Sequence, residues 1–176
     1  MNLYLVTRDM LIRAAGLDPQ KAPRLPNKPL KWRPVLVLPA SDDPDKSRLI
    51  KSIGSNVNDR SKKSYFLVMV TALFSAATTD DFAQFFNGTN VIYKTAHKFL
   101  YSGKWEIVHE LKLGQKDRIY LYPYSDKSGK YIFILEVLHK NQNPTPDDVK
   151  ARSEDVIKLI LTAKMFKLKN PGAHHE

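Results

Sequence analysis

Apolar and polar positions in the first half of the chain fall into blocks with different spacing. Residues 35–38 (VLVL) form a continuous apolar run, which is typical of a buried strand. A helix-start cluster at 41–44 is followed by apolar residues at helical spacing until Gly54. Residues 61–77 predict a second helix, and because its apolar residues lie nearly all round it, this helix should be buried. Residues 80–86 add one further helical turn.

The second half of the chain predicts strands. Residues 104–113 and 118–124 alternate between the two faces of a strand, and residues 130–138 are almost wholly apolar, as in a central strand covered on both faces. The segments between them, 114–117 and 125–129, are hairpin-type loops. We therefore expect these strands to be antiparallel.

The last helix has the clearest boundaries. Thr145 is expected to be its N-cap, Pro146 occupies the first helical position, and two aspartates follow next to the positive end of the helix dipole. From residue 34 onward the elements read β-α-α-β-β-β-α. This order predicts an α+β fold, with a small antiparallel sheet packed against helices.

Residues 1–33 differ from the rest of the chain. They contain seven Lys or Arg residues and two acidic residues, and prolines prevent a long helix across their second half. A short element is predicted at 3–15, followed by an extended basic segment. That segment is either an arm that contacts a polyanion or a partner, or a strap laid over the domain. The predicted organisation is a basic N-terminal extension (1–33), an α+β domain (34–170) and a tail (171–176).

Composition narrows the class of protein. The 176 residues include 28 Lys or Arg and 18 Asp or Glu, and the net charge of +10 favours polyanions such as nucleic acid, ribosomes or anionic membranes, although basic charge also serves solubility alone. The absence of cysteine excludes disulfides, thiolate zinc sites and cysteine nucleophiles. The N-terminal apolar run is interrupted by Arg8 and Asp9, and the run at 65–77 is shorter than the roughly 20 residues of a membrane span. We expect a soluble, cytoplasmic protein without a membrane partner.

Several kinds of chemistry are not indicated. The seven glycines are scattered singly, so the sequence has no phosphate-binding loop and no dinucleotide fingerprint. The histidines never fall at metal-ligand spacing with carboxylates, and the paired acids lie at expected helix starts, where capping explains them. The sequence therefore predicts neither a cofactor nor a metal site.

A group of basic, aromatic and imidazole side chains remains on the predicted strands. Its members are Lys112, Lys116, Arg118, Tyr120, Tyr122, His139 and Lys140. Metal-free RNA cleavage needs a base for the 2′-hydroxyl proton, cations for the charge on the phosphate and an acid for the leaving oxygen. Exposed aromatic rings can also stack an unpaired base. The alternative interpretation is a solvated sheet surface without a function.

Three segments occur in a characteristic order. They are GKWEI at 103–107, DRIYLY at 117–122, and an apolar strand that leads into Thr-Pro within 132–146. Together they resemble motifs of the RelE/ParE superfamily of bacterial and phage toxins, most closely its HigB branch, over roughly residues 100–160.

The resemblance implies the toxin component of a toxin–antitoxin system. Such a toxin is a metal-independent endoribonuclease that cleaves mRNA on the ribosome, and its partner is a cognate antitoxin protein. Arg118 matches the family's strand arginine and Lys140 matches the first lysine of its terminal basic pair. His139 lies beside Lys140, and an imidazole can serve as a base or an acid. The candidate residues are Arg118, His139, Lys140 and Tyr122 for catalysis, and Lys112, Lys116, Tyr120 and His109 for nucleic-acid binding.

The sequence departs from the family pattern at three positions. Val108, Asn141 and Pro144 stand where the family usually has basic residues, and residues 1–33 have no counterpart in the compact family chain. Two alternatives stay open. One is a non-catalytic protein that binds nucleic acid or a partner on the same scaffold, and the other is gyrase inhibition, as in the ParE branch. Oligomeric state and sequence preference are not predicted.

Overall fold

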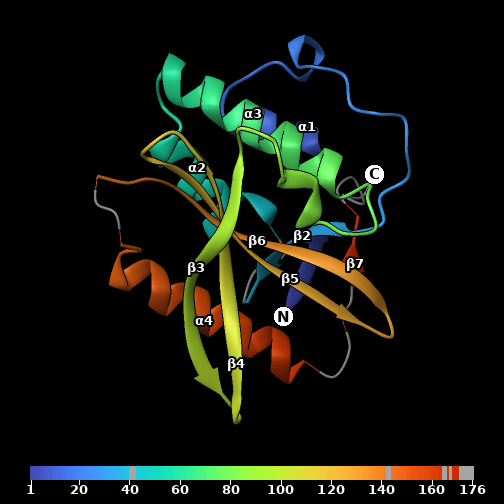
Figure 1. The fold of residues 1–176 in the computed structure, drawn as a ribbon, viewed down its shortest axis with the longest axis vertical. Coiled ribbons are helices and arrows are strands. Elements are labelled where there is room, and N and C mark those ends of the chain that lie inside the picture. The colour runs from blue at the N-terminus through green and yellow to red at the C-terminus, as the bar shows by residue number, and fades with distance from the viewer. Residues whose placement is uncertain (40–42, 142–143, 164–165, 167, 171–176) are drawn as a thin grey trace.

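A mixed sheet organises the fold in the computed structural model, which describes residues 1–39, 43–141, 144–163, 166 and 168–170 (Figure 1). The strand order within these residues is β3-β4-β5-β6-β2-β1-β7. The strands are β1 (Asn2–Leu5), β2 (Arg33–Leu38), β3 (Ile92–Tyr101), β4 (Lys104–Leu113), β5 (Asp117–Asp126), β6 (Gly129–His139) and β7 (Leu168–Lys169). The α-helices are α1 (Arg8–Ala14), α2 (Arg48–Asn56), α3 (Arg60–Ala76) and α4 (Asp147–Thr162).

The α+β class is confirmed, but the sheet is larger than predicted and is not purely antiparallel. β2 runs parallel to β6, and β1 runs parallel to β7, whereas the other neighbouring strands are antiparallel. The prediction recognised β2, β4, β5 and β6 and missed the other strands. β3 was missed because it is an edge strand with mostly exposed residues, which removes the apolar alternation on which the prediction relied.

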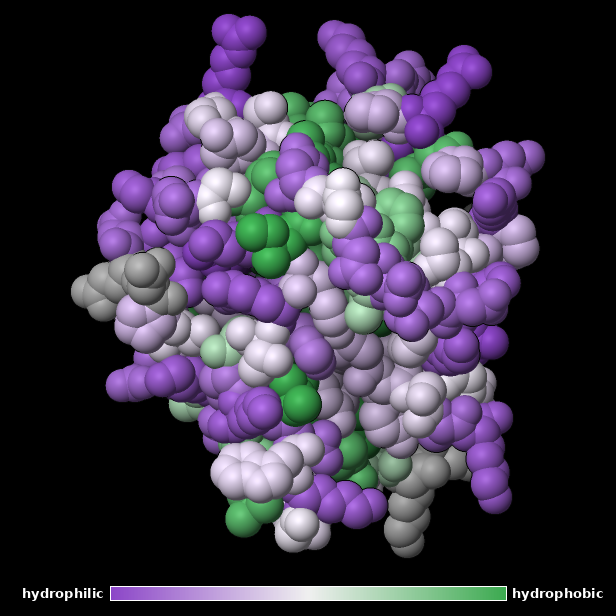
Figure 2. All heavy atoms as spheres, in the orientation of Figure 1, coloured by the Kyte–Doolittle hydropathy of each residue, from purple (hydrophilic) through white to green (hydrophobic). Residues whose placement is uncertain are grey.

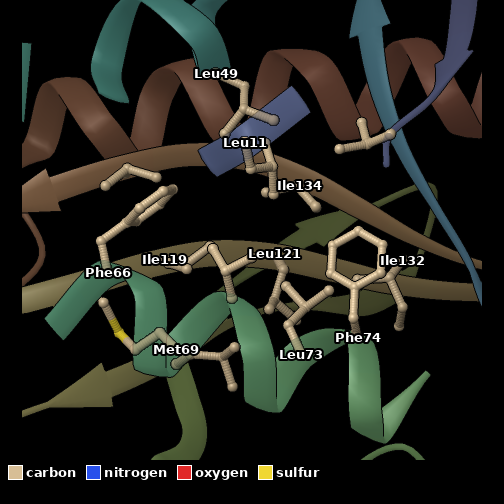
Figure 3. Close-up of a cluster of buried hydrophobic side chains, with 14 of the residues drawn as sticks. Leu11, Leu49, Phe66, Met69, Leu73, Phe74, Ile119, Leu121, Ile132 and Ile134 are labelled. Carbon is tan, nitrogen blue, oxygen red and sulfur yellow. The ribbon is translucent and has the colours of Figure 1, made fainter. Parts of the chain in front are cut away.

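Helices cover both faces of the sheet. One buried cluster lies between the sheet and α1, α2 and α3, and includes Leu11, Leu49, Phe66, Met69, Leu73, Phe74, Ile119, Leu121, Ile132 and Ile134 (Figure 3). A second cluster lies between the sheet and α4, and includes Val108, Tyr120, Phe133, Val149, Ile157 and Ile160. The predicted alternation along β5 is therefore confirmed, since its apolar and tyrosine faces enter different clusters.

Capping chemistry determines where two of the helices begin. The Ser47 side chain accepts a hydrogen bond from the amide of Ile50 at the start of α2, and Asp59 accepts one from Lys62 at the start of α3. α2 continues through Gly54, where the sequence predicted its end.

α4 begins differently from the prediction. It starts at Asp147 without a side-chain cap, because the predicted N-cap Thr145 is buried and lies beside Tyr120 instead. Residues 41 and 42 of the predicted helix-start cluster and the predicted tail, 171–176, lie outside the described residues.

The first 33 residues lie along the domain. β1 pairs with β2, and α1 contributes to the same core as α2 and α3. Further on, the amides of Lys31 and Trp32 both donate to the carbonyl of Ala77, and Leu25 packs against the core. The Pro-rich segment therefore runs over the domain as a strap.

Candidate functional site

The residues predicted from the sequence gather mainly at the end of the sheet where β4 turns into β5. The β4–β5 register places Lys112 opposite Arg118, and the β5–β6 register places Asp117 opposite His139. These two antiparallel ladders follow from the short turns that the sequence predicted. The structure thereby brings to one end of the sheet Lys112, Lys116, Arg118, His139 and Lys140.

Strand alternation divides this group between two faces. Residues directly opposite on antiparallel strands share a face, so Lys112 and Arg118 point toward the side that α4 covers. Lys140 approaches the same side. Asp117 and His139 share the other face, which α2 covers. The predicted catalytic residues therefore do not all face one ligand.

Arg118 and Lys140 belong to a buried ionic cluster around Glu110. Arg118 Nε lies 3.2 Å from Glu110 Oε1, Lys94 Nζ lies 3.4 Å from the same oxygen, and Lys140 Nζ lies 4.0 Å from Oε2. Arg118 is 1% exposed and Lys140 is 5% exposed, and burial lowers the pKa of Lys140. Buried charges are tolerated only when they are paired, so Glu110 keeps these cations inside the fold.

The Arg118 guanidinium also shapes the turn between β4 and β5. Its Nη1 donates to the carbonyl of Asp117 at 2.9 Å, and its Nη2 donates to the carbonyl of Gln115 at 2.9 Å. The same side chain also contacts Glu110 through Nε, so all three of its nitrogens have a partner. In this arrangement Arg118 stabilises the site's backbone and does not face a ligand.

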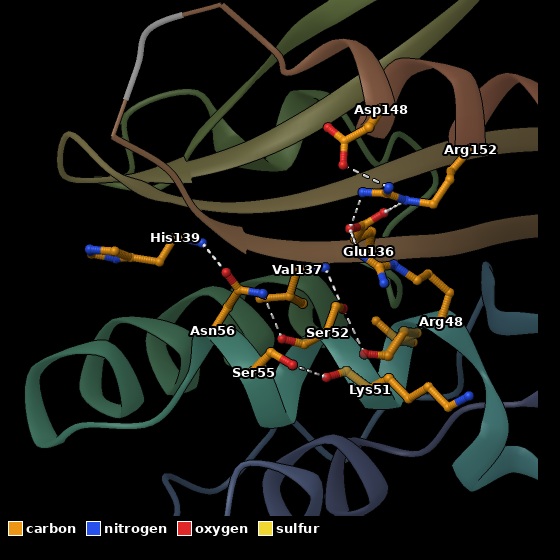
Figure 4. Close-up of polar contacts among 11 residues, drawn as sticks. Arg48, Lys51, Ser52, Ser55, Asn56, Glu136, Val137, His139, Asp148 and Arg152 are labelled. Carbon is orange, nitrogen blue, oxygen red and sulfur yellow. Dashed lines mark hydrogen bonds and ion pairs between the residues drawn. The ribbon is translucent and has the colours of Figure 1, made fainter.

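His139 is partly exposed, and its ring lies beside the buried carboxylate of Asp117. His139 Nδ1 lies 2.9 Å from Asp117 Oδ1, and the imidazole side chain is 24% exposed. The His139 amide donates to Asn56 Oδ1 at 3.1 Å, while the Asn56 amide group donates to the Ser52 carbonyl at 3.0 Å (Figure 4). In Figure 4 the imidazole points away from α2. A carboxylate that accepts from Nδ1–H leaves Nε2 of the neutral ring as a proton acceptor.

The side chains of Tyr120, Tyr122 and His109 make contacts within the fold. Tyr120 is fully buried, which raises its pKa to about 12. The Tyr122 hydroxyl donates to Glu106 Oε2 at 2.6 Å, and burial and this bond raise the pKa of Tyr122. His109 is stacked on Tyr93 with ring centroids 4.7 Å apart, on the face opposite to Arg118. The structure does not bring Tyr122 or His109 to the end of the sheet where the cations gather.

A second ionic cluster lies further along β6. Glu136 is 2% exposed and accepts hydrogen bonds from Arg48 at 2.5 Å and from Arg152 at 2.9 Å, and Arg152 also pairs with Asp148 (Figure 4). These contacts join α2, β6 and α4. We interpret this cluster as structural, because the Glu136 carboxylate is already bonded to Arg48 and Arg152.

Sequence reasoning missed Glu110, Asp117 and Asn56. Glu110 and Asp117 could have been found from the sequence, because each is an acidic residue on or next to a predicted strand, near the basic residues with which it pairs. Asn56 could not have been found from the sequence. It lies at the end of α2, and only the packing of α2 on β6 brings it to His139.

Neither a metal-ligand cluster nor a membrane-spanning helix occurs in the described part of the chain. Among the residues that the structure describes, no group of three or more His, Asp or Glu side chains can hold a metal ion. Within the same part of the chain, no helix has the length and apolar character needed to cross a membrane. His174 and His175 lie outside the described residues.

Comparisons with family models, with curated proteins and with solved structures find no match to this chain. The resemblance to RelE/ParE toxins therefore stays a prediction from the residues that carry it.

Two partly buried histidines, His97 and His109, predict how stability changes with pH. Burial lowers the pKa of both His97 and His109, so the folded state favours their neutral forms. The stability they provide is present above the unfolded pKa of about 6.5 and is lost as the pH falls through the folded pKa, by about 1.4 kcal/mol per pH unit for each histidine. Urea denaturation at about pH 7.5 and about pH 5.5 should show lower stability at the acidic pH, and His109→Phe should reduce the difference. Equal stability at both values would contradict the prediction.

Proposed function

We propose that the protein is a metal-independent endoribonuclease in which His139 is the acid–base group and Asp117 orients it. The observation that carries this proposal is the hydrogen bond between Asp117 and an imidazole that is partly exposed beside a basic turn. Of the four catalytic residues predicted from the sequence, His139 is the one whose reactive atom remains available to a substrate at this end of the sheet.

RNA supplies its own nucleophile, so the protein needs only to move protons and stabilise charge. His139 Nε2 accepts the proton of a 2′-hydroxyl, the 2′-oxygen bonds to phosphorus as the bond from phosphorus to the 5′-oxygen breaks, and the leaving 5′-oxygen takes up a proton from water. The products are a 2′,3′-cyclic phosphate and a 5′-hydroxyl. The step therefore requires a 2′-hydroxyl next to the cleaved bond and cannot occur on DNA.

Cations at this end of the sheet favour a phosphate ligand, with Lys116 in the turn near His139 and the others on the face opposite to His139. Lys116 is exposed in the β4–β5 turn, and Lys112 is partly exposed opposite Arg118. Behind them, Arg118, Lys140 and Lys94 surround the one carboxylate of Glu110, so the cluster carries excess positive charge. That charge attracts a polyanion without direct contact.

The biological role proposed with this chemistry is that of a toxin. Following the resemblance at residues 103–146, the chain would cleave mRNA on the ribosome and would be restrained by an antitoxin protein. Expression of the chain alone should then arrest growth, and expression of a His139→Ala variant should not.

A binding function without cleavage is the second candidate. It is favoured by the burial of Arg118 and Lys140, which pair with Glu110 and are closed to a phosphate. A protein of this kind binds RNA or DNA with a strong dependence on salt and releases no product.

The test is incubation of the purified chain with a short end-labelled single-stranded RNA in the presence of EDTA. We expect fragments that end in a 2′,3′-cyclic phosphate. A matched RNA with a 2′-deoxy sugar at the cleaved position should remain intact there. If the RNA is bound but never cleaved, with or without ribosomes, the endoribonuclease proposal fails and the binding function replaces it.

A further inference from the structure

The β3–β4 hairpin continues past the body of the sheet. β4 pairs with β5 only from His109 to Leu113, and before His109 its described ladder partner is β3 alone. Ser102 and Gly103 form the tip, with φ values of 49° and 77°, as in a tight two-residue turn. Figure 1 shows the two strands extending together to this tip. The hairpin end is therefore a two-stranded ribbon with a fixed geometry.

One face of this ribbon is held by the rest of the protein. Phe99 is buried in the α4 cluster with the Lys158 ammonium 5.8 Å from its ring centroid, and Glu106 accepts the hydrogen bond from Tyr122. These contacts attach the ribbon to α4 and β5, so the side chains on the opposite face are presented on a supported surface.

The opposite face, which we call the hairpin face, is formed by Lys98, Leu100, Trp105 and Ile107. Leu100 and Trp105 are cross-strand partners and are 60% and 67% exposed. Neither belongs to the two core clusters. Figure 2 shows hydrophilic residues over most of the molecule in this view, with hydrophobic residues gathered over α3 and again near the lower end, where the hairpin ends.

We propose that the hairpin face binds single-stranded RNA, with one base stacked on Trp105 and a phosphate contacting Lys98. Charge selects this occupant over an apolar protein segment. Lys98 is exposed, while Glu106, the one acidic residue of the ribbon, points to the other face and is bonded to Tyr122. Lys104 also points to the other face, but it is exposed beside the turn and adds positive charge at the tip. A second copy of the chain would bring like charges together. An exposed indole beside an exposed lysine can bind an unpaired nucleotide.

This inference rests on the proposed function for the identity of the ligand, which is RNA. It adds a second contact for that RNA, at the hairpin face. Trp105 and Leu113, the β4 residue opposite Asp117, lie on the same strand and the same face, so their backbones are about 26 Å apart at about 3.3 Å per residue. An RNA that reaches both must be several nucleotides long. We therefore expect longer oligonucleotides to bind more tightly than those that cover only one end of β4.

The test is fluorescence anisotropy with a labelled 2′-O-methyl oligouridylate, which cannot undergo 2′-hydroxyl attack. Trp105→Ala and Trp105→Leu should each raise Kd by about 5- to 150-fold, the loss of one base–aromatic stack, whereas Trp105→Phe should retain most of the affinity. Leu159→Ala, at a 41% exposed apolar residue of α4, is the matched control and should leave Kd unchanged. Because Trp105 is exposed, all variants should melt at the temperature of the parent protein.

Three results overturn the inference. One is binding of the oligonucleotide by Trp105→Ala within twofold of the parent. Another is binding by Trp105→Leu as tight as by Trp105→Phe, which would indicate an apolar protein contact. A change in solution mass without a change in RNA affinity would instead identify an interface between copies. Since the probe cannot be cleaved, each outcome is independent of whether His139 cleaves RNA.

Discussion

Glu110→Gln is expected to lower the free energy of unfolding by about 3–5 kcal/mol, the range found when one partner of a buried ion pair is removed. The carboxylate is 2% exposed, and Arg118, Lys94 and Lys140 lie within 4.0 Å of its oxygens. Glutamine keeps the shape of the side chain but removes the negative charge that faces the buried Arg118 and Lys140. Urea denaturation of both proteins at neutral pH measures the difference.

A control variant at the surface distinguishes the loss of a buried carboxylate from the loss of an exposed one. Asp147→Asn removes the partner of Lys150 at an exposed position, and stability should change by less than about 1 kcal/mol. If Glu110→Gln unfolds at the same urea concentration as the parent, the buried cluster does not have the role described here.

His139→Ala is expected to lower the rate of RNA cleavage by about 10²- to 10⁴-fold, the usual contribution of a positioned acid–base group. The fold should survive, because the side chain is partly exposed and the contact with Asn56 is made by the backbone amide. The rate is measured on end-labelled RNA under single-turnover conditions. Circular dichroism of both proteins establishes that the variant is folded.

Asp117→Asn tests the orienting role separately. An amide can present its NH₂ group to Nδ1, which favours the wrong tautomer, so cleavage should be slower and its pH profile should change while RNA binding is retained. Lys127→Ala, in the exposed β5–β6 turn, is the control and should cleave normally. Cleavage by His139→Ala within a few-fold of the parent would remove His139 from the mechanism. Arg118 is not suited to this test, since its loss would disturb the turn as well as the charge.

The two faces of β5 were predictable because strand alternation is a local property. Ile119 and Leu121 enter one core, whereas Tyr120 and Tyr122 enter the other. The burial of the second face was not predictable, because α4 covers it and the position of α4 depends on the whole sheet. The same packing accounts for Val108, which is 0% exposed beneath α4 at a position where the family pattern has a basic residue.

The site was predictable in part for a similar reason. Short turns bring the strand ends that carry Arg118 and His139 together, and the sequence shows those turns. Which partner each side chain finds depends on register between strands and on the α2 contact, so the pairing of Arg118 with Glu110 and of His139 with Asp117 had to come from the structure.

The most direct test of the central claim is to map where RNA binds. Addition of the 2′-O-methyl oligonucleotide to ¹⁵N-labelled protein should shift the amide resonances of Lys112, Lys116, Asp117 and His139, together with the Trp105 indole. Shifts confined to other surfaces, with residues 112–117 and 139–140 unchanged at saturating RNA, would show that this end of the sheet does not bind RNA.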